Sequence, residues 1–211
     1  MRLSLAQRLW LPTLAIAAIF TAVGITISLR TSGQIAHSTT VLQDSEAKLI
    51  DAAQWRGLTQ SNVVRVVASL SSADPAVEVQ FKPEIAETTA AISAIQKRVD
   101  AAATDPQERA ALERIAETRK AYIGARNAAA KAKEAGDASS ARTMLAEKVQ
   151  PAVTAYLAAQ QAYVDLQRER TAAVRAQTGA ERQRTVVLVL ALLAAVVGGL
   201  VISTMLLVRA V

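Results

Sequence analysis

The 211-residue sequence contains no cysteine and is poor in glycine, proline and aromatic residues. Without cysteine, neither a disulfide framework nor a thiolate metal site can form. Eight Gly and five Pro leave few places for turns, whereas an all-β fold needs a turn about every 8–12 residues. Hydrophobic residues make up 52% of the chain but aromatic residues only 3%, so Ala, Val, Leu and Ile dominate. Because alanine is the strongest helix former, this composition predicts an all-α protein.

Charge and motifs exclude several function classes. The formal net charge is +6, but basic residues are interleaved with acids and form no stripe, which argues against nucleic-acid binding. The single histidine, His37, lies in a polar stretch that is typical of a surface position. The sequence has no nucleophile–base pair, metal-ligand spacing or glycine-rich phosphate loop. We therefore expect neither an enzyme nor a bound metal or cofactor.

Two charge-free apolar runs, 9–29 and 185–208, are long enough to cross a bilayer. The first covers roughly 31 Å as a helix. A cleaved signal peptide is the alternative for this run, but its apolar region would be only about 7–15 residues long. Trp10 stands in its first turn, where an interfacial aromatic residue is common. We therefore predict two transmembrane helices.

The charges in the short segments outside the two apolar runs predict the orientation of the chain in the membrane. Arg2, Arg8 and Arg209 lie in these flanks, and positive charge in short flanks marks the cytoplasmic side. The sequence thus predicts a cytoplasmic tail over 1–8, spans over 9–29 and 185–208, and the start of a cytoplasmic linker over 209–211. Residues 30–184 would form a periplasmic domain on a bacterial inner membrane. Because the sequence ends three residues after the second run, we expect it to be part of a longer protein.

Helix breakers divide residues 30–184 into four stretches. They stand at 71–75, 104–106 and 135–137, and Pro151 is expected to kink the last stretch. Short loops between consecutive helices predict an up-down-up-down four-helix bundle. The outer two stretches are longer than the middle two, so their ends would protrude as a two-helix stalk. Because such a stalk cannot bury its apolar seam alone, a homodimer is expected.

Polar residues interrupt the apolar seam of each stretch. Arg119, Tyr122 and Arg126 share one face of the third stretch at i, i+3 and i+7. Arginine is rarely buried unless it is paired, and no acid occupies a seam position. A carboxylate ligand would neutralise these guanidinium groups. Counting of helical turns places Thr88, Arg119, Arg56 and Tyr156 at similar heights in four helices, and Arg126 one to two turns higher. Together with Tyr122, these are the candidate ligand-binding residues.

A structural interpretation of the same residues stays open. The arginines could reach the rim of the bundle and pair with acids of neighbouring helices, and the tyrosines could be ordinary core residues. The charge run 168–170 is expected to form a solvated helix face, and the run 181–184 a membrane-interface anchor.

The layout resembles the sensor region of a bacterial methyl-accepting chemotaxis protein with a four-helix-bundle ligand-binding domain. Residues 55–65 are similar to the arginine-bearing part of the first helix in that family. A family site for amino acids is matched by Arg56 and Arg65, but Ser61 stands where that site has a third arginine. The resemblance implies a ligand-sensing function coupled to chemotaxis signalling.

A second pattern resembles the subgroup of that family that binds citrate, malate and related acids. It consists of Thr88-Thr89, Arg119-x-x-Tyr122-x-x-x-Arg126 and Tyr156. The resemblance implies that Arg119 and Arg126 clamp carboxylates, with the threonine and tyrosine hydroxyls as hydrogen-bonding partners. The alternatives are the sensor half of a histidine kinase or cyclase, which uses the same bundle, and a non-sensing membrane scaffold.

Overall fold

The structure, a computed structural model, describes residues 5–210, and within 5–35 and 182–210 it describes only part of the side chains. The described residues contain no strand, which confirms the all-α fold. The predicted segments 1–8 and 209–211 lie partly outside the described residues. The helical elements in chain order are α1 (Leu5–Ser71), α2 (Pro75–Ala102), α3 (Pro106–Glu134), α4 (Ala138–Met144), a π-helical turn η1 (Leu145–Val149) and α5 (Gln150–Ala210).

The predicted helix breaks are confirmed, and each is fixed by an aspartate cap. The side chains of Asp74, Asp105 and Asp137 accept hydrogen bonds from backbone N–H groups in the first turns of α2, α3 and α4. A proline opens α2 and α3, where its missing N–H costs nothing. Gly136 adopts φ +81°, which lets the chain reverse between α3 and α4.

The π turn η1 directly precedes α5, whose second residue is Pro151. The kink expected at Pro151 itself stays a prediction. The backbone N–H of Gln150 donates to the carbonyl of Leu145, one residue farther back than in an α-helix. Pro151 follows immediately and has no N–H to donate. The two irregularities are therefore adjacent, in the first turns after the α3–α4 connection.

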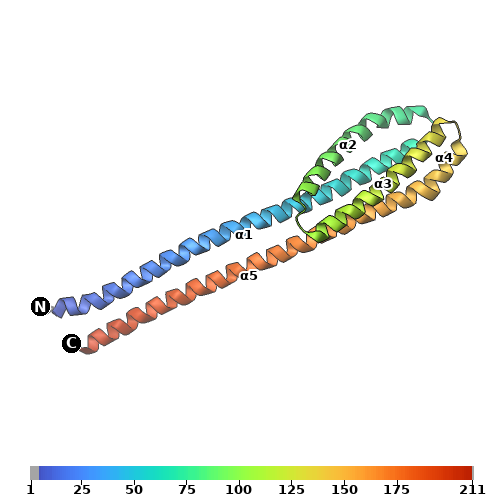
Figure 1. Ribbon diagram of the computed structural model, residues 1–211. Coiled ribbons are helices and arrows are strands. Elements are labelled where there is room, and N and C mark those ends of the chain that lie inside the picture. The colour runs from blue at the N-terminus through green and yellow to red at the C-terminus, as the bar shows by residue number, and fades with distance from the viewer. Residues whose placement is uncertain (1–4, 211) are drawn as a thin grey trace. The chain divides into compact units, whose positions relative to one another are not determined.

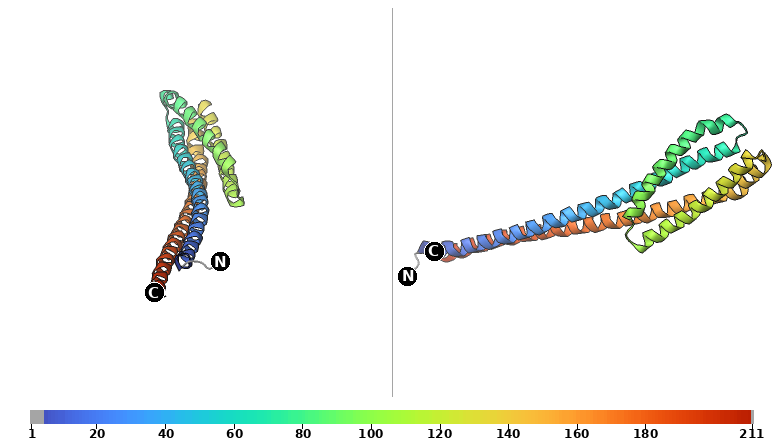
Figure 2. Two further views of the ribbon diagram at one scale, coloured as in Figure 1. Left: turned by 90° about the vertical axis from the view of Figure 1, so that its left-hand side faces the viewer. Right: turned by 45° about the horizontal axis from the view of Figure 1, so that its top comes forward.

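The chain forms two compact units, residues 44–172 and the remaining terminal segments. In the unit 44–172, four helical segments lie side by side (Figure 1). The α1–α2 and α3–α4 turns lie at one end of this unit and the α2–α3 connection at the other. In the other unit, the first part of α1 and the last part of α5 run together (Figure 2), and Ser38 donates a hydrogen bond to Glu181 at 3.0 Å. The predicted four-helix bundle is thus confirmed.

The bundle core follows most of the predicted seams, with two corrections. Trp55 is only 1% exposed and takes the core position expected for Arg56 in α1, while Arg56 is half-buried. In α5, the buried face is more polar than expected and includes Gln160, Gln167 and Thr171. The apolar core residues include Val63 and Val66 of α1, Ile92, Ile95 and Val99 of α2, Ile115 and Ala129 of α3, Leu145 and Val149 of η1, and Tyr163 of α5.

One helical stretch among the described residues, Ala138–Gly199, is long and apolar enough to cross a membrane. This assessment rests on length and composition, and none of its apolar window is buried inside the chain. Most side chains of the run 9–29 lie outside the described set. The two spans and the domain boundaries therefore stay predictions.

Candidate functional site

A cavity of about 50 Å³ lies inside the bundle and is lined by all four of its helical segments. Five of the seven candidate residues line this cavity, so the structure brings most of the predicted set together. The lining residues are Thr59, Asn62 and Val63 of α1, Thr89 and Ile92 of α2, Arg119, Tyr122, Ile123 and Arg126 of α3, and Tyr156 of α5.

The two arginines of the cavity are half-buried and have neutral hydrogen-bond partners. Arg119 donates to the side-chain oxygen of Gln96 at 2.6 Å, and Arg126 donates twice to Asn127, at 3.2 and 3.0 Å. Neither forms an ion pair within the part of the chain that the structure describes. The cavity lining contains no carboxylate. Two positive charges therefore face one small cavity without a counter-charge.

Tyr122 and Tyr156 form the aromatic wall of the cavity. Their rings stack with centroids 5.9 Å apart and an interplanar angle of 19°. Burial raises the pKa of both hydroxyl groups above the usual value. Both hydroxyls are therefore neutral at physiological pH and keep a proton that can be donated to an anion.

Unpartnered polar atoms gather around the same level of the bundle. The described residues contain four buried side-chain nitrogen or oxygen atoms without a hydrogen-bond partner, and they belong to Trp55, Arg56, Asn62 and Gln160. The first three lie within two turns of α1, and Gln160 donates through its other amide atom to Thr59 of the cavity at 3.1 Å. Because buried polar groups are nearly always paired, such a cluster points to a place that water or a ligand occupies.

Two candidate residues do not reach the cavity. Thr88 donates its hydroxyl to the backbone carbonyl of Glu84 at 2.7 Å, and its neighbour Thr89 lines the cavity instead. Arg56 reaches along its own helix to Gln60, at 3.4 Å. Consecutive side chains of a helix point about 100° apart. Because Trp55 and Thr59 point into the core, Arg56 points away from it.

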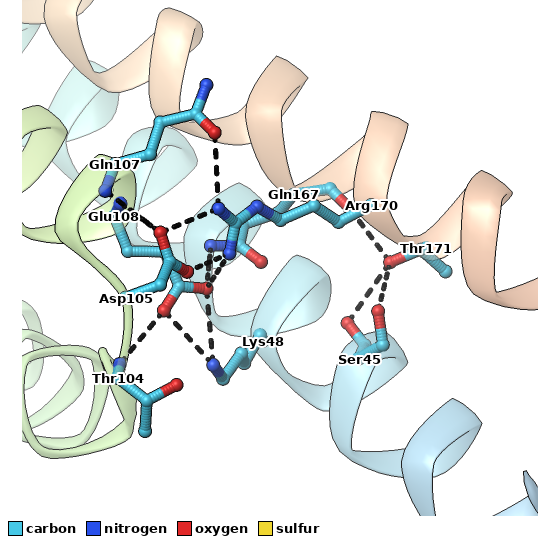
Figure 3. Close-up of polar contacts among 9 residues, drawn as sticks. All are labelled: Ser45, Lys48, Thr104, Asp105, Gln107, Glu108, Gln167, Arg170 and Thr171. Atoms are coloured by element: carbon cyan, nitrogen blue, oxygen red, sulfur yellow. Dashed lines mark hydrogen bonds and ion pairs between the residues drawn. The ribbon is translucent and has the colours of Figure 1, made fainter.

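Sequence reasoning missed a second polar cluster, at the end of the bundle where the α2–α3 connection lies (Figure 3). At its centre, Glu108 is only 1% exposed and accepts hydrogen bonds from Lys48 at 3.2 Å and from Gln167 at 3.0 Å. Arg170 pairs with both Asp105 and Glu108, so the predicted solvated face over 168–170 is wrong at this residue. The Asp105-Pro106 motif indicated where α3 begins. It gave no sign of the partners from α1 and α5, which are distant in sequence.

The cluster lowers the pKa of both of its carboxyl groups. For Asp105 the main cause is the hydrogen bond from Arg170. Burial alone would raise the pKa of Glu108, but the hydrogen bonds that it accepts from Gln167, Lys48 and the Thr104 N–H outweigh burial. Both carboxylates are therefore ionised at neutral pH. They join the α2–α3 connection to α1 and α5, and Thr171 of α5 also bonds Ser45 of α1, at 2.9 Å between hydroxyl oxygens.

Comparison with known proteins places the chain in a family. Residues 2–181 match a family model described as a four-helix bundle sensory module for signal transduction. No curated protein matches the chain. The resemblance to chemoreceptor sensor regions is confirmed at the level of the family, whereas the carboxylate-sensing subgroup stays a prediction. The match extends over most of the sequence, and the chain therefore belongs to the family of four-helix bundle sensory modules for signal transduction.

Proposed function

We propose that this sensory module binds a small di- or tricarboxylate in the cavity between its four helices and reports that binding to chemotaxis signalling. The observation that carries the proposal is the pair Arg119 and Arg126, which face one cavity without an acidic partner. Guanidinium groups bind carboxylates through paired, charge-assisted hydrogen bonds. Thr89, Tyr122 and Tyr156 add hydroxyl groups around the same space.

The size of the empty cavity supports a mechanism in which the ligand moves the helices. Its volume of about 50 Å³ is far below the roughly 300–1,000 Å³ of a typical ligand pocket. A dicarboxylate is larger, so its entry requires the lining side chains and helices to move apart. The ligand would thus favour a more open packing of the bundle, and the signal is this shift in population.

A continuous helix, α5, could transmit this movement from the cavity to the membrane. Tyr156 of the cavity stands near the start of α5, which runs without interruption to Ala210. This helix includes the apolar run 185–208, and we assign that run and 9–29 as two spans of a bacterial inner membrane. Residues 30–184 then face the periplasm, and both ends of the sequence face the cytoplasm, where an output domain of the receptor would receive the signal.

A second copy of the chain would cover one face of α1. Ile50 and Val64 are 65% and 62% exposed, and Gly57 stands midway between them at heptad spacing. Large exposed apolar residues in register on one helix favour packing against an equivalent helix. The homodimer expected from the unequal helix lengths therefore has a specific candidate surface on α1.

Thermal unfolding of the full chain in detergent micelles or nanodiscs tests the ligand class. Di- and tricarboxylates, amino acids and neutral sugars would each be added at millimolar concentration. A ligand present at 100 times its dissociation constant stabilises the folded state by about 2.7 kcal/mol. We expect a rise in Tm with carboxylates and none with sugars. If no carboxylate raises the Tm, the proposed ligand class is wrong.

A further inference from the structure

A larger hollow lies beside the cavity, nearer to the end of the bundle where the α1–α2 and α3–α4 turns lie (Figure 1). This hollow, which we call the outer groove, has a volume of about 360 Å³ and is lined by α1, α2 and α3. Its charged lining residues are Glu78, Lys82, Arg126, Lys133 and Glu134. Arg126 also lines the cavity, so the outer groove and the cavity meet at this residue.

The two volumes indicate where an anion from solution finds room first. The cavity is too small for a dicarboxylate until its walls move apart, whereas the outer groove already has the size of a ligand pocket, roughly 300–1,000 Å³. Another hollow, which Gly57 and Phe81 line on α1 and α2, shares no lining residue with the cavity. The outer groove is therefore the better candidate for the way into the cavity.

The charges of the outer groove favour an approaching anion. Lys133 pairs with Glu78 at 3.4 Å, so these two charges offset each other. Lys82 is exposed and forms no ion pair with any residue that the structure describes. Lys82 and Arg126 share the groove with one further carboxylate, that of Glu134. Two cations and one anion leave a net positive charge in the groove.

The contacts of Arg126 suit a residue that passes an anion inwards. Its guanidinium group donates to the side-chain oxygen of Asn127, which lines the outer groove and is neutral. A carboxylate can replace this partner, because hydrogen bonds between two charged groups are stronger than those to a neutral amide. Arg119 lies two helical turns farther along the same face of α3. An anion held by Arg126 is thus already at the boundary of the cavity.

We infer that the outer groove is a capture site for carboxylates and the entry route to the cavity. The ligand binds first to Lys82 and Arg126, and it moves on to Arg119 as the helices separate. This inference rests on the proposed function, because the route leads to a carboxylate site in the cavity. Lys82 lies outside the cavity and acts in association, since charges at the edge of a site mainly change the association rate and its salt dependence.

Binding kinetics of the full chain in nanodiscs test the capture site, with malate and citrate as probes. Calorimetry gives Kd, ligand-observed NMR line shapes give koff, and their ratio gives kon. Lys82→Glu should lower kon at least about threefold at low salt, with koff within about twofold of wild type. At about 0.5 M salt this difference should largely disappear, because the charges are screened. Lys148→Glu, at an exposed position of η1 outside the groove, is the matched control and should keep the wild-type kon.

A bulkier side chain in the outer groove tests the entry route independently. Ala130 lines the groove, and Ala130→Leu should lower kon and koff together by at least about threefold, because an obstructed route delays entry and exit equally. Its Kd should stay close to the wild-type value, since the bound state in the cavity is unchanged. Ala121→Leu, at an exposed position of the same helix, is the matched control and should change neither rate.

The outcomes separate this inference from the proposed function. Wild-type rates in Lys82→Glu, or an equal loss of kon in Lys148→Glu, would overturn the capture site. Wild-type rates in Ala130→Leu would overturn the entry route. In both cases the carboxylate site itself stands if Arg119→Ala still weakens binding of the probes. If neither malate nor citrate binds to wild type, both proposals fail.

Discussion

The ring of Tyr122 on α3 stacks on the ring of Tyr156 on α5, with their centroids 5.9 Å apart. Both residues line the cavity, so the contact that joins α3 to α5 is also part of the candidate site. A ligand that opens the cavity acts directly on the spacing between these two helices. The stack therefore connects the stability of the bundle with its proposed sensing function.

A double-mutant cycle measures the contribution of this stack to stability. Replacing either tyrosine with leucine should lower the free energy of unfolding by about 2 kcal/mol, because a large buried side chain is lost. The double variant should lose about 1 kcal/mol less than the sum, since stacked aromatic pairs contribute about 0.5–1.5 kcal/mol beyond burial. Denaturant unfolding of the full chain in micelles gives these values.

Tyr163 supplies the control for that cycle. It is buried two helical turns from Tyr156 and is not stacked on Tyr122. Combining Tyr122→Leu with Tyr163→Leu should therefore give additive losses within about 0.5 kcal/mol. Equal coupling in the two cycles would show that the stack has no energetic role of its own.

Glu108 should be the most sensitive carboxylate of the bundle. Glu108→Gln leaves Lys48 and Arg170 without the buried negative charge that they share, and we expect a loss of about 3 kcal/mol in unfolding free energy. The matched control is Glu117→Gln, whose exposed side chain pairs with the exposed Arg114 on the same helix. This control should stay within about 0.5 kcal/mol of wild type. Similar losses in both variants would contradict a central role for Glu108.

Acid should destabilise the bundle through the same cluster. The pKa values of Asp105 and Glu108 are lowered in the folded state, so in acid the unfolded chain binds more protons than the folded chain. Their stabilisation is therefore complete above the unfolded pKa values, near pH 4, and is lost as the pH falls below them. The denaturant midpoint, measured between pH 7 and 3, should fall steeply below pH 4.

The variant Asp105→Asn/Glu108→Gln separates this cluster from the other acids of the chain. It should start with a lower midpoint at pH 7 and show a shallower fall in acid. Glu117→Gln should retain the wild-type pH profile, because its carboxylate is exposed. A double variant with the full wild-type acid dependence would assign the effect to other groups.

The absence of cysteine makes the proposed dimer surface simple to test. Val64→Cys introduces a single thiol on the exposed face of α1, and mild oxidation of the full chain in membranes should give a disulfide-linked dimer. Val79→Cys, which is 72% exposed on α2, is the matched control and should stay largely uncrosslinked. Equal crosslinking at the two positions would argue against a dimer through α1.

Local sequence chemistry predicted the helix boundaries well. Aspartate and proline stand together before α2 and α3, and these residue types act through neighbouring backbone groups, so their effect can be read without knowing the fold. The placement of Arg119, Tyr122 and Arg126 on one face likewise follows from helical spacing alone. Half of the residues that line the cavity were thus candidates from the sequence.

The polar core was not predictable in the same way. In α5, Ala159 and Leu166 are only partly buried, whereas the fold buries Gln160 and Gln167. Glutamine normally favours the surface, and it is accepted here because Thr59 and Glu108 meet its amide nitrogens across the bundle. Such partners lie far away in sequence, so local patterns contain no signal for them.

The central claim is that Arg119 holds a carboxylate in the cavity, and matched calorimetric titrations of two arginine variants test it most directly. The ligand is the carboxylate that gives wild type the largest rise in Tm. Arg114→Ala removes an exposed arginine from the same helix and should bind like wild type. Arg119→Ala should bind at least about tenfold more weakly while keeping its helix content, because a charge-assisted hydrogen bond contributes about 1.5–3 kcal/mol. Equal affinity in the two variants would contradict the account.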